Sequence, residues 1–259
     1  MTLNGKVAFI TGGGRGLGRA MALAMAREGA HVVIMSRTAK ELREVVSLIR
    51  ASGGEGHYCE GDVSKPKDVS RGIEEAVKEY ARLDILVNNA AVIGPARFLE
   101  DADEAAWQKT INTSLYGAFL CCRTAGRVMK ERGSGKIINI SSGLGQMAYP
   151  RFCAYAVSKA GLIQMARSLA EEWRPMSIQV NAIDPGVMDT GMQEGVRDLG
   201  PAVLGKDLHD HLVEFKERGL LKDPEQVAAL AVYLASPSSN HLSGHFGTLD
   251  YYRRLGWNG

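Results

Sequence analysis

Residues 7–18 read VAFITGGGRGLG, an apolar run followed directly by a glycine-rich segment. The apolar run predicts a short buried strand, and the Ala-, Met- and Leu-rich stretch up to Glu28 predicts a helix that Gly29 ends. A second apolar run over residues 31–35 predicts another strand. Glycines between a strand and a helix allow positive φ angles and bring the helix N-terminus close to an anion. The stretch therefore predicts a βαβ unit that binds the pyrophosphate of a dinucleotide.

The same alternation of strands and helices continues along the chain. Further strands are predicted at residues 56–59, 84–87, 136–140, 178–183 and 245–249, and further helices at residues 40–51, 66–80, 105–132, 154–173, 206–217 and 224–235. Such alternation predicts parallel strands, right-handed crossovers and helices on both faces of one sheet. We therefore expect an α/β fold: a Rossmann-like, doubly wound parallel sheet of about seven strands, with residues 1–259 forming a single domain.

Composition excludes several classes of partner. The chain has 45% hydrophobic and 23% charged residues and a net charge of +2, with Lys and Arg spread along its length. This pattern predicts neither a nucleic-acid nor a membrane partner. No apolar run reaches the roughly 18 residues that a membrane helix needs. The four cysteines form no CxxC pair, so we expect reduced thiols and a cytoplasmic protein.

Polar and glycine-rich motifs follow five of the predicted strands. They are residues 11–18, Asp62, residues 88–91, Ser142 and residues 185–186. Because ligands of such sheets bind at the carboxyl ends of the strands, these motifs are expected to meet at one edge.

A tyrosine and a lysine occupy one predicted helix near that edge. Tyr155 and Lys159 are four residues apart, which places both on one helix face. A cation beside a phenol favours the phenolate, so this pair is suited to acid–base chemistry.

Together these residues resemble the short-chain dehydrogenase/reductase family in its compact form, in particular 3-oxoacyl and carbonyl reductases. The resemblance extends over nearly the whole chain, from Gly5 to about Asp250. The glycine segment matches the family's TGxxxGxG pattern, and Ser142 stands thirteen residues before Tyr155, as the family's catalytic serine does. The resemblance implies hydride transfer between a nicotinamide and a ketone or secondary alcohol. It also implies a homotetramer or homodimer built partly on the predicted helices at residues 105–132 and 155–173.

The resemblance assigns roles to individual residues. Tyr155 is the expected general acid and base, Lys159 lowers its pKa and binds the ribose, and Ser142 orients the carbonyl. Ser114 takes the place of the family's fourth catalytic residue. The expected cofactor-binding residues are Gly12, Gly14, Arg15, Gly16, Leu17, Gly18, Ser36, Arg37, Asp62, Val63, Asn89, Ala90, Tyr155, Lys159, Pro185, Gly186, Val187 and Thr190.

The end of the second strand bears on the choice of coenzyme. An acidic residue there would bind the ribose 2′-hydroxyl of NAD, but the sequence reads Met35-Ser36-Arg37. Arg37 is suited to pairing with a 2′-phosphate, and Arg15 supplies a second cation. We therefore expect NADP(H) to be favoured over NAD(H).

Several positions depart from the family pattern. The family has Asn where this chain has Ser114, and that Asn holds a helix kink whose carbonyl binds a water in a proton relay to the catalytic lysine. Asp184 precedes Pro185 where small or apolar residues are usual. Asp250-Tyr-Tyr252 replaces a common Asp-Gly-Gly ending.

The expected substrate pocket is mostly apolar and consists of Leu144, Gln146, Met147, Tyr149, Phe152, Val187 and Met188, with a mobile lid over residues 190–221. This favours an uncharged or amphiphilic carbonyl substrate, such as an acyl chain, a sterol-like ring or a quinone. No metal is expected, since His209 and His211 do not share a helix face. Two alternatives are a nucleotide-binding regulator or scaffold without turnover and, from its Tyr/Lys pair, a sugar-nucleotide epimerase or dehydratase.

Overall fold

A computed structural model describes residues 1–259. The chain forms a seven-stranded, fully parallel sheet in the order β3-β2-β1-β4-β5-β6-β7, which confirms the predicted fold class. The strands are β1 (Val7–Thr11), β2 (His31–Ser36), β3 (Gly56–Glu60), β4 (Ile85–Asn88), β5 (Gly135–Ile140), β6 (Ile178–Ile183) and β7 (Phe246–Gly247). The order reverses direction between β1 and β4, at the switch point where such sheets bind ligands.

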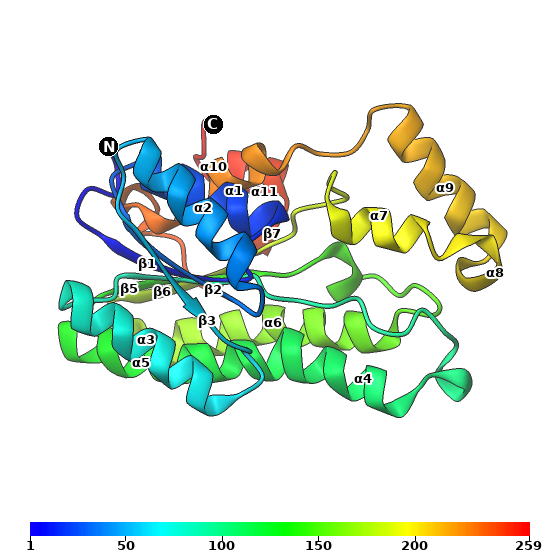
Figure 1. Cartoon of the computed structure of the whole chain (residues 1–259), viewed down its shortest axis with the longest axis horizontal. Coiled ribbons are helices and arrows are strands. Elements are labelled where there is room, and N and C mark those ends of the chain that lie inside the picture. The colour runs from blue at the N-terminus through cyan, green and yellow to red at the C-terminus, as the bar shows by residue number, and fades with distance from the viewer.

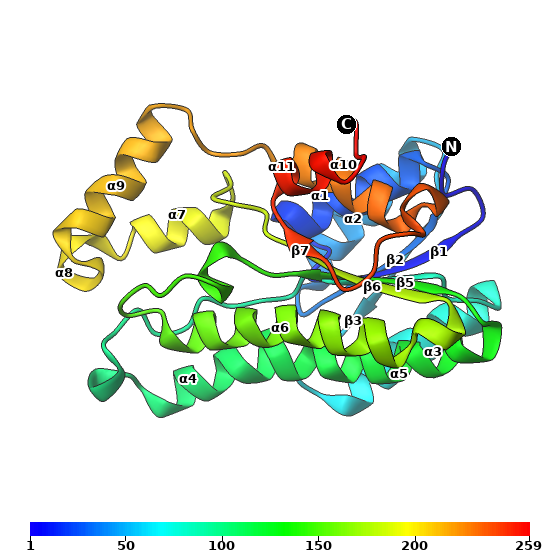
Figure 2. The same cartoon turned by 180° about the vertical axis from the view of Figure 1, so that it is seen from behind.

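Helices cover both faces of the sheet (Figures 1 and 2). One layer contains α1 (Gly16–Arg27), α2 (Ala39–Ala51), α10 (Pro224–Ala235) and α11 (Leu249–Arg254), and the other contains α3 (Pro66–Tyr80), α4 (Glu104–Ile111), α5 (Gly117–Arg132) and α6 (Cys153–Glu172). Alternate residues of β1 point into different layers, because Ala8 and Ile10 join one apolar cluster while Val7 and Phe9 join the other. Burial on both faces explains why the strands are almost continuously apolar. None of the helices is both long and apolar enough to cross a membrane.

Two predicted elements differ from those observed. The expected helix over residues 105–132 is helical throughout, but residues Asn112–Tyr116 form a π-helical turn between α4 and α5. The expected strand over residues 245–249 is only the two-residue β7, since Thr248 caps α11 and accepts a hydrogen bond from Tyr251 N at 3.4 Å. Tyr252, from the unusual C-terminal segment, is fully buried and donates to the Ala182 carbonyl at 2.9 Å. Its side chain thus ties α11 to β6.

A small helical cap extends beyond the carboxyl ends of the strands (Figures 1 and 2). It consists of α7 (Gly191–Arg197), α8 (Gly200–Leu204) and α9 (Lys206–Glu217). Its own apolar cluster contains Ala96, Phe152, Val196, Leu204 and Leu212. The cap is thus seated on the loop before α4 and on the start of α6.

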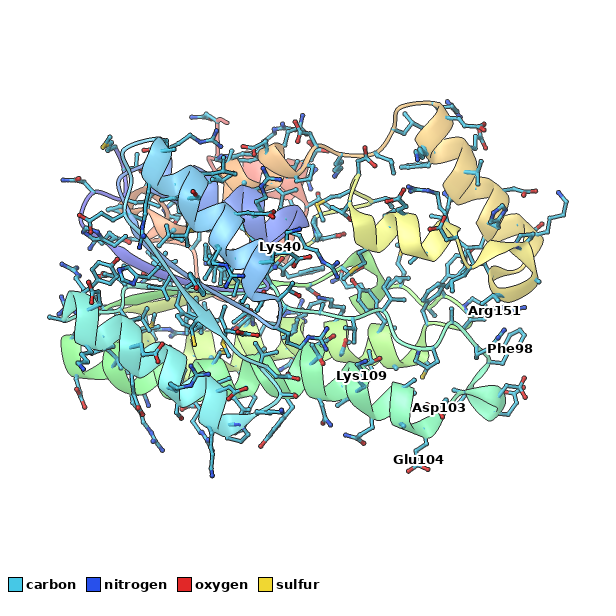
Figure 3. The ribbon with its side chains drawn as sticks, in the orientation of Figure 1. Lys40, Phe98, Asp103, Glu104, Lys109 and Arg151 are labelled. Atoms are coloured by element: carbon cyan, nitrogen blue, oxygen red, sulfur yellow. The ribbon has the colours of Figure 1, made fainter.

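One arginine links the cap to the rest of the molecule. Arg151 Nη1 donates to the Val203 carbonyl at 2.7 Å, and its guanidinium lies 4.3 Å from the centre of the Phe98 ring. Figure 3 shows Arg151 and Phe98 side by side below α8. Arg151 also adopts a left-handed backbone conformation, with φ of 73°.

Candidate active site

A cavity of about 420 Å³ lies at the carboxyl edge of the sheet. It extends from the glycine segment between β1 and α1 to the Tyr155–Lys159 pair on α6. The expected site residues that line it are Gly12, Gly14, Arg15, Gly16, Leu17, Gly18, Ser36, Arg37, Asp62, Val63, Asn89, Ala90, Tyr155, Lys159, Pro185, Met188 and Thr190. Residues from at least six separate segments of the chain therefore meet in one cavity.

The glycine segment fits a dinucleotide pyrophosphate. Helix α1 begins at Gly16, which has φ of 53°, and its N-cap Arg15 makes no side-chain capping bond. The first amide groups of the helix therefore remain available to an anion. A Cβ atom added at Gly18 would lie 2.1 Å from the Gly12 carbonyl oxygen, so α1 packs against the loop more closely than any side chain permits.

The loop after β4 is tied to the end of β1 by side chains. The Thr11 hydroxyl accepts from the amides of Asn89 and Ala90 at 3.0 and 3.1 Å. Asn89 Nδ2 in turn donates to the carbonyls of Thr11 and Gly12 at 2.9 and 3.2 Å. These bonds fix the middle of the cavity. The side-chain amide of Asn89 is already bonded to the backbone.

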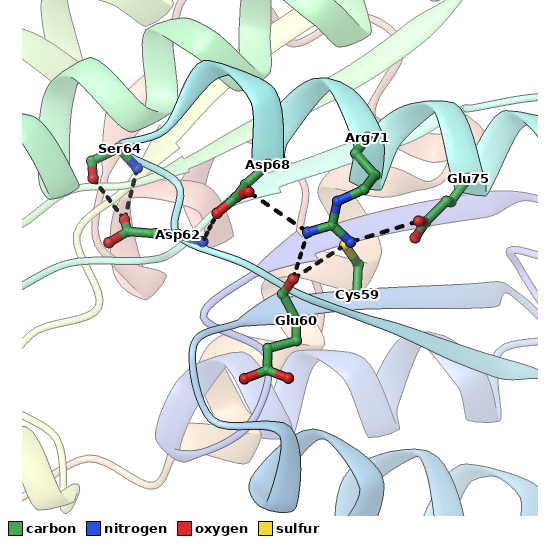
Figure 4. A network of polar contacts seen from close by, with 7 residues as sticks. All are labelled: Cys59, Glu60, Asp62, Ser64, Asp68, Arg71 and Glu75. Atoms are coloured by element: carbon green, nitrogen blue, oxygen red, sulfur yellow. Dashed lines mark hydrogen bonds and ion pairs between the residues drawn. The ribbon is translucent and has the colours of Figure 1, made fainter.

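Asp62 is held by a network at the end of β3 (Figure 4). Its carboxylate accepts from the amide and hydroxyl of Ser64 at 2.9 and 2.7 Å, and its own amide donates to Asp68 at 2.9 Å. Burial raises the pKa of Asp62, but the Ser64 hydrogen bonds and the charges of Arg37 and Lys65 outweigh it and lower the pKa overall. The carboxylate is therefore ionised and held in one orientation at the end of the cavity next to β2 and β3, where the resemblance predicts the adenosine.

The same end of the cavity contains a second carboxylate, which the sequence analysis did not predict. Glu41, in the first turn of α2, lines the cavity, and its side chain lies against Gly14. Arg15 Nη1 lies 3.7 Å from Glu41 Oε1. The end of β2 itself has no acidic residue, but the first turn of the helix after β2 reaches the same edge of the sheet.

Tyr155 and Lys159 are both buried at the other end of the cavity. Lys159 Nζ lies 5.3 Å from the centre of the Tyr155 ring and donates to the Ile140 carbonyl at 2.7 Å. Ser141, which precedes Ser142, donates to the Lys159 carbonyl at 2.8 Å and so fastens α6 to the end of β5.

Burial dominates the protonation of this pair. It raises the pKa of Tyr155 to about 12, a hydrogen bond with Ser142 lowers that pKa in part, and the negative charge of Asp184 raises it. Burial also lowers the pKa of Lys159 to about 7. The phenol is therefore protonated near neutral pH, and the lysine is poised to gain or lose its proton there.

Ser114 does not line the cavity. It is buried in the π-helical turn, where its hydroxyl accepts from Val92 N at 3.1 Å and donates to the Val92 carbonyl at 3.4 Å. Asn112 makes its bond on an exposed face, with Gln108 at 2.9 Å. The Ser114 side chain thus pins the loop after β4, and its neighbour Thr113 lines the cavity instead.

Most of the expected substrate residues lie outside the cavity. Phe152 is buried in the cap cluster, and Leu144 packs against the same cluster. Gln146, Met147 and Tyr149 are exposed. Met188 lines the cavity, while Gly186 and Val187 do not. The sequence pattern predicts that these residues lie near the site, but the burial of their side chains depends on where the cap packs.

No group of three or more His, Cys, Asp or Glu residues is arranged to hold a metal ion. His209 pairs with its neighbour Asp210 at 3.4 Å, and His211 packs on the Phe215 ring.

The parallel sheet, the glycine segment and the buried Tyr–Lys pair define an oxidoreductase of alcohols and carbonyl compounds. The family model described as short chain dehydrogenase matches residues 6–199. The chain is 34% identical over 252 residues to an uncharacterised oxidoreductase from Thermotoga maritima, with 96% of this chain and 98% of that protein covered. It therefore belongs to the short-chain dehydrogenase family.

Two further relatives indicate the range of that family. A 3beta-hydroxysteroid dehydrogenase from Mediterraneibacter gnavus is 32% identical, with 95% of this chain and 93% of that protein covered. A solved NAD+-bound xylitol dehydrogenase superposes with a TM-score of 0.89 at 25% identity, covering 96% of this chain and 98% of that one.

Proposed function

We propose that this protein transfers a hydride between NADP(H) and a ketone or secondary alcohol, with Tyr155 as general acid and base. One observation carries the proposal: a buried tyrosine and a buried lysine lie at the inner end of the cavity whose outer end is the glycine segment. The nicotinamide, when bound, supplies or accepts the hydride.

Residues of the protein carry out the proton transfer that accompanies the hydride transfer. In reduction the Tyr155 hydroxyl gives its proton to the forming alkoxide, and its high pKa keeps it protonated until then. In oxidation the same oxygen takes the alcohol proton, and the ammonium of Lys159 lowers the cost of the phenolate. Ser142 holds the substrate oxygen beside the phenol. Ser114 acts through Val92 by fixing the loop, and the backbone of the π-helical turn takes the relay role.

The main test of this mechanism is Tyr155→Phe. The variant keeps the ring but loses the hydroxyl group and the proton that it donates. We therefore expect kcat to fall by roughly 10²–10⁴-fold with cofactor affinity unchanged. Turnover with a panel of ketones is followed by NADPH absorbance, and cofactor binding by fluorescence titration. Cofactor binding with no hydride transfer to any ketone, in wild type and variant alike, would support the regulator instead.

The cations at the adenosine end support NADP(H). Arg37 lines the cavity beside Ser36, and Arg15 partly neutralises Glu41, one of the two carboxylates there with Asp62. A 2′-phosphate would accept charge-assisted hydrogen bonds from these guanidinium groups.

Coenzyme titration of Arg37→Ala tests this preference. We expect NADPH to bind about 10- to 100-fold more weakly and NADH to be little affected, since a hydrogen bond to a charged group is worth about 1.5–3 kcal/mol. Lys40→Ala is the matched control, because Lys40 lies in the first turn of α2 (Figure 3) but does not line the cavity. Glu41→Gln should strengthen NADPH binding. A wild-type preference for NADH would contradict the proposal.

We also propose a homodimer or homotetramer that pairs the outer surfaces of α5 and α6. Tyr116, Phe119 and Val157 are large apolar residues exposed there, and the rings of Tyr116 and Phe119 stack at 5.7 Å. Light scattering of wild type and Phe119→Glu tests this assembly.

A further inference from the structure

Asp184 is a carboxylate fixed at the end of β6. Its amide donates to the Gly247 carbonyl at 2.8 Å, and its Oδ1 accepts from Gly186 N at 3.0 Å. No Lys, Arg or His nitrogen lies within 4 Å of it in an ion pair. The second oxygen, Oδ2, is therefore held in place without a charged partner.

That second oxygen lies beside the backbone that directly follows Ser142. Asp184 Oδ2 lies 3.2 Å from where a Cβ atom of Gly143 would stand, beside the end of the Met147 side chain. Gly143 directly follows Ser142, and the charge of Asp184 also reaches the phenol of Tyr155. The carboxylate thus lies next to the segment that carries Ser142 and within electrostatic range of Tyr155, and a side chain at position 143 would approach it closely.

A lysine side chain covers the same turn without forming an ion pair with Asp184. The Cδ, Cε and Nζ atoms of Lys222 lie 3.1 Å from where a Cβ atom of Gly186 would stand, so the side chain covers the glycine that donates to Asp184. The Lys222 backbone is fixed by its bond to the Val187 carbonyl at 2.9 Å. One acceptor and one donor of opposite charge therefore lie beside the turn formed by residues 184–186.

We propose that Asp184 is a specificity-determining residue that accepts a hydrogen bond from a hydroxyl on the carbon next to the reacting carbon. The substrate class is then an uncharged α-hydroxy ketone, or the vicinal diol formed from it. This inference rests on the proposed oxidoreductase function.

Three physical arguments favour a hydroxyl. An apolar neighbour would desolvate the carboxylate without replacing its hydrogen bond. An anionic neighbour would be repelled by a like charge at short range. An ammonium would lose its advantage because Lys222 already supplies a positive charge, whereas a hydroxyl can donate to one group and accept from the other.

The experiment compares three four-carbon substrates that differ only beside the ketone: 3-hydroxy-2-butanone, 2-butanone and 2-oxobutanoate. The pair 2-hydroxycyclohexanone and cyclohexanone repeats the test on a larger frame. For wild type we expect kcat/KM to be about tenfold or more higher for each hydroxy ketone than for its parent ketone, and lowest for 2-oxobutanoate.

Asp184→Asn is the main variant, since its carbonyl keeps the bond to Gly186 N while an NH₂ group replaces Oδ2. Its kcat/KM for the hydroxy ketones should fall between about tenfold and a hundredfold, and that for the parent ketones should change by less than about threefold. Asp184→Ser is a second variant in case the first folds poorly, and thermal unfolding checks both. Asp189→Asn, an exposed carboxylate on the same segment, should leave the selectivity unchanged.

The outcomes separate the two proposals. Equal losses for hydroxy and parent ketones, or a wild type without preference between them, overturn the role of Asp184 and leave the oxidoreductase standing. A wild type that oxidises NADPH or NADH with none of the five ketones overturns the proposed function itself.

Discussion

The glycine segment and the helical cap meet at the same edge of the sheet, but they are built differently. The glycine segment lies against an apolar cluster of 31 buried residues and is tied to the end of β4 by Thr11 and Asn89. The cap has a cluster of only five buried residues, and it also buries Arg197, whose Nη1 has no hydrogen-bond partner. The glycine segment is fixed by close backbone contacts, whereas the cap can move at little cost in free energy. Under the function that we propose, a rigid surface binds the cofactor and an adaptable one binds the substrate.

The same substitution in both regions gives the largest contrast. In Gly18→Ala the new methyl group would lie 2.1 Å from the Gly12 carbonyl oxygen, so α1 must shift away from the loop. We expect cofactor affinity to fall by more than about a hundredfold and the protein to lose about 1–3 kcal/mol of stability. Gly195→Ala, in α7, meets no atom within 4 Å and should be neutral or stabilise the cap by about 0.5–1 kcal/mol. Similar losses in both variants would break the comparison.

Two leucines test whether the cap contributes to global stability. Leu42→Ala removes a fully buried side chain from the large cluster, and we expect unfolding in urea to become easier by about 2–5 kcal/mol. Leu212→Ala removes a side chain from the cap cluster. It should leave the global midpoint nearly unchanged and accelerate hydrogen exchange only in α7 to α9. A fall in the global midpoint equal to that of Leu42→Ala would show that cap and sheet unfold together.

The same difference explains what the sequence could predict. The strands, the glycine segment and the position of Asp62 follow from local rules: the strands are continuously apolar, and glycine is required where α1 approaches the loop. The positions of Phe152, Met147 and Tyr149 do not follow, because they depend on how a five-residue cluster seats the cap. The π-helical turn does not follow from local rules either, because its apolar pattern fits an ordinary helix. The bond between the Ser114 side chain and Val92 depends on that turn and could not be predicted.

Lys159→Met tests the Tyr155 end of the cavity. There, burial and the charge of the lysine change the pKa of Tyr155 in opposite directions. Burial raises the pKa of the phenol. Lys159 lies 5.3 Å from the centre of the ring, and in its protonated form a cation at that distance favours the phenolate. Alcohol oxidation needs the phenolate, so its rate should rise with pH in the wild type. In the variant the rise should move to higher pH, and oxidation at or just below pH 7, where Lys159 with its pKa of about 7 still carries its charge, should be slower by on the order of tenfold or more. The measurement is the pH profile of kcat/KM for oxidation, and an unmoved profile would mean that Lys159 does not act on the phenol.

Arg151→Ala should give the smallest effect, confined to the cap. The side chain bonds the Val203 carbonyl at 2.7 Å and stacks on Phe98. We expect the substrate KM to rise about two- to fivefold with cofactor affinity and global stability unchanged, because two modest contacts are lost at a surface that can readjust. Arg253→Ala is the matched control, since Arg253 lies over the Trp257 ring in the C-terminal segment and should leave KM unaltered.

A glycine at the same position separates the side chain from the backbone. Arg151 has φ of 73°, which costs a non-glycine residue about 1–3 kcal/mol, and Arg151→Gly removes that strain together with the guanidinium. If the cap is held by the side chain, both variants should raise KM alike and only Arg151→Gly should gain stability. If KM rises in Arg151→Gly alone, the strained backbone itself positions the start of α6, and the cap is less adaptable than its small cluster implies.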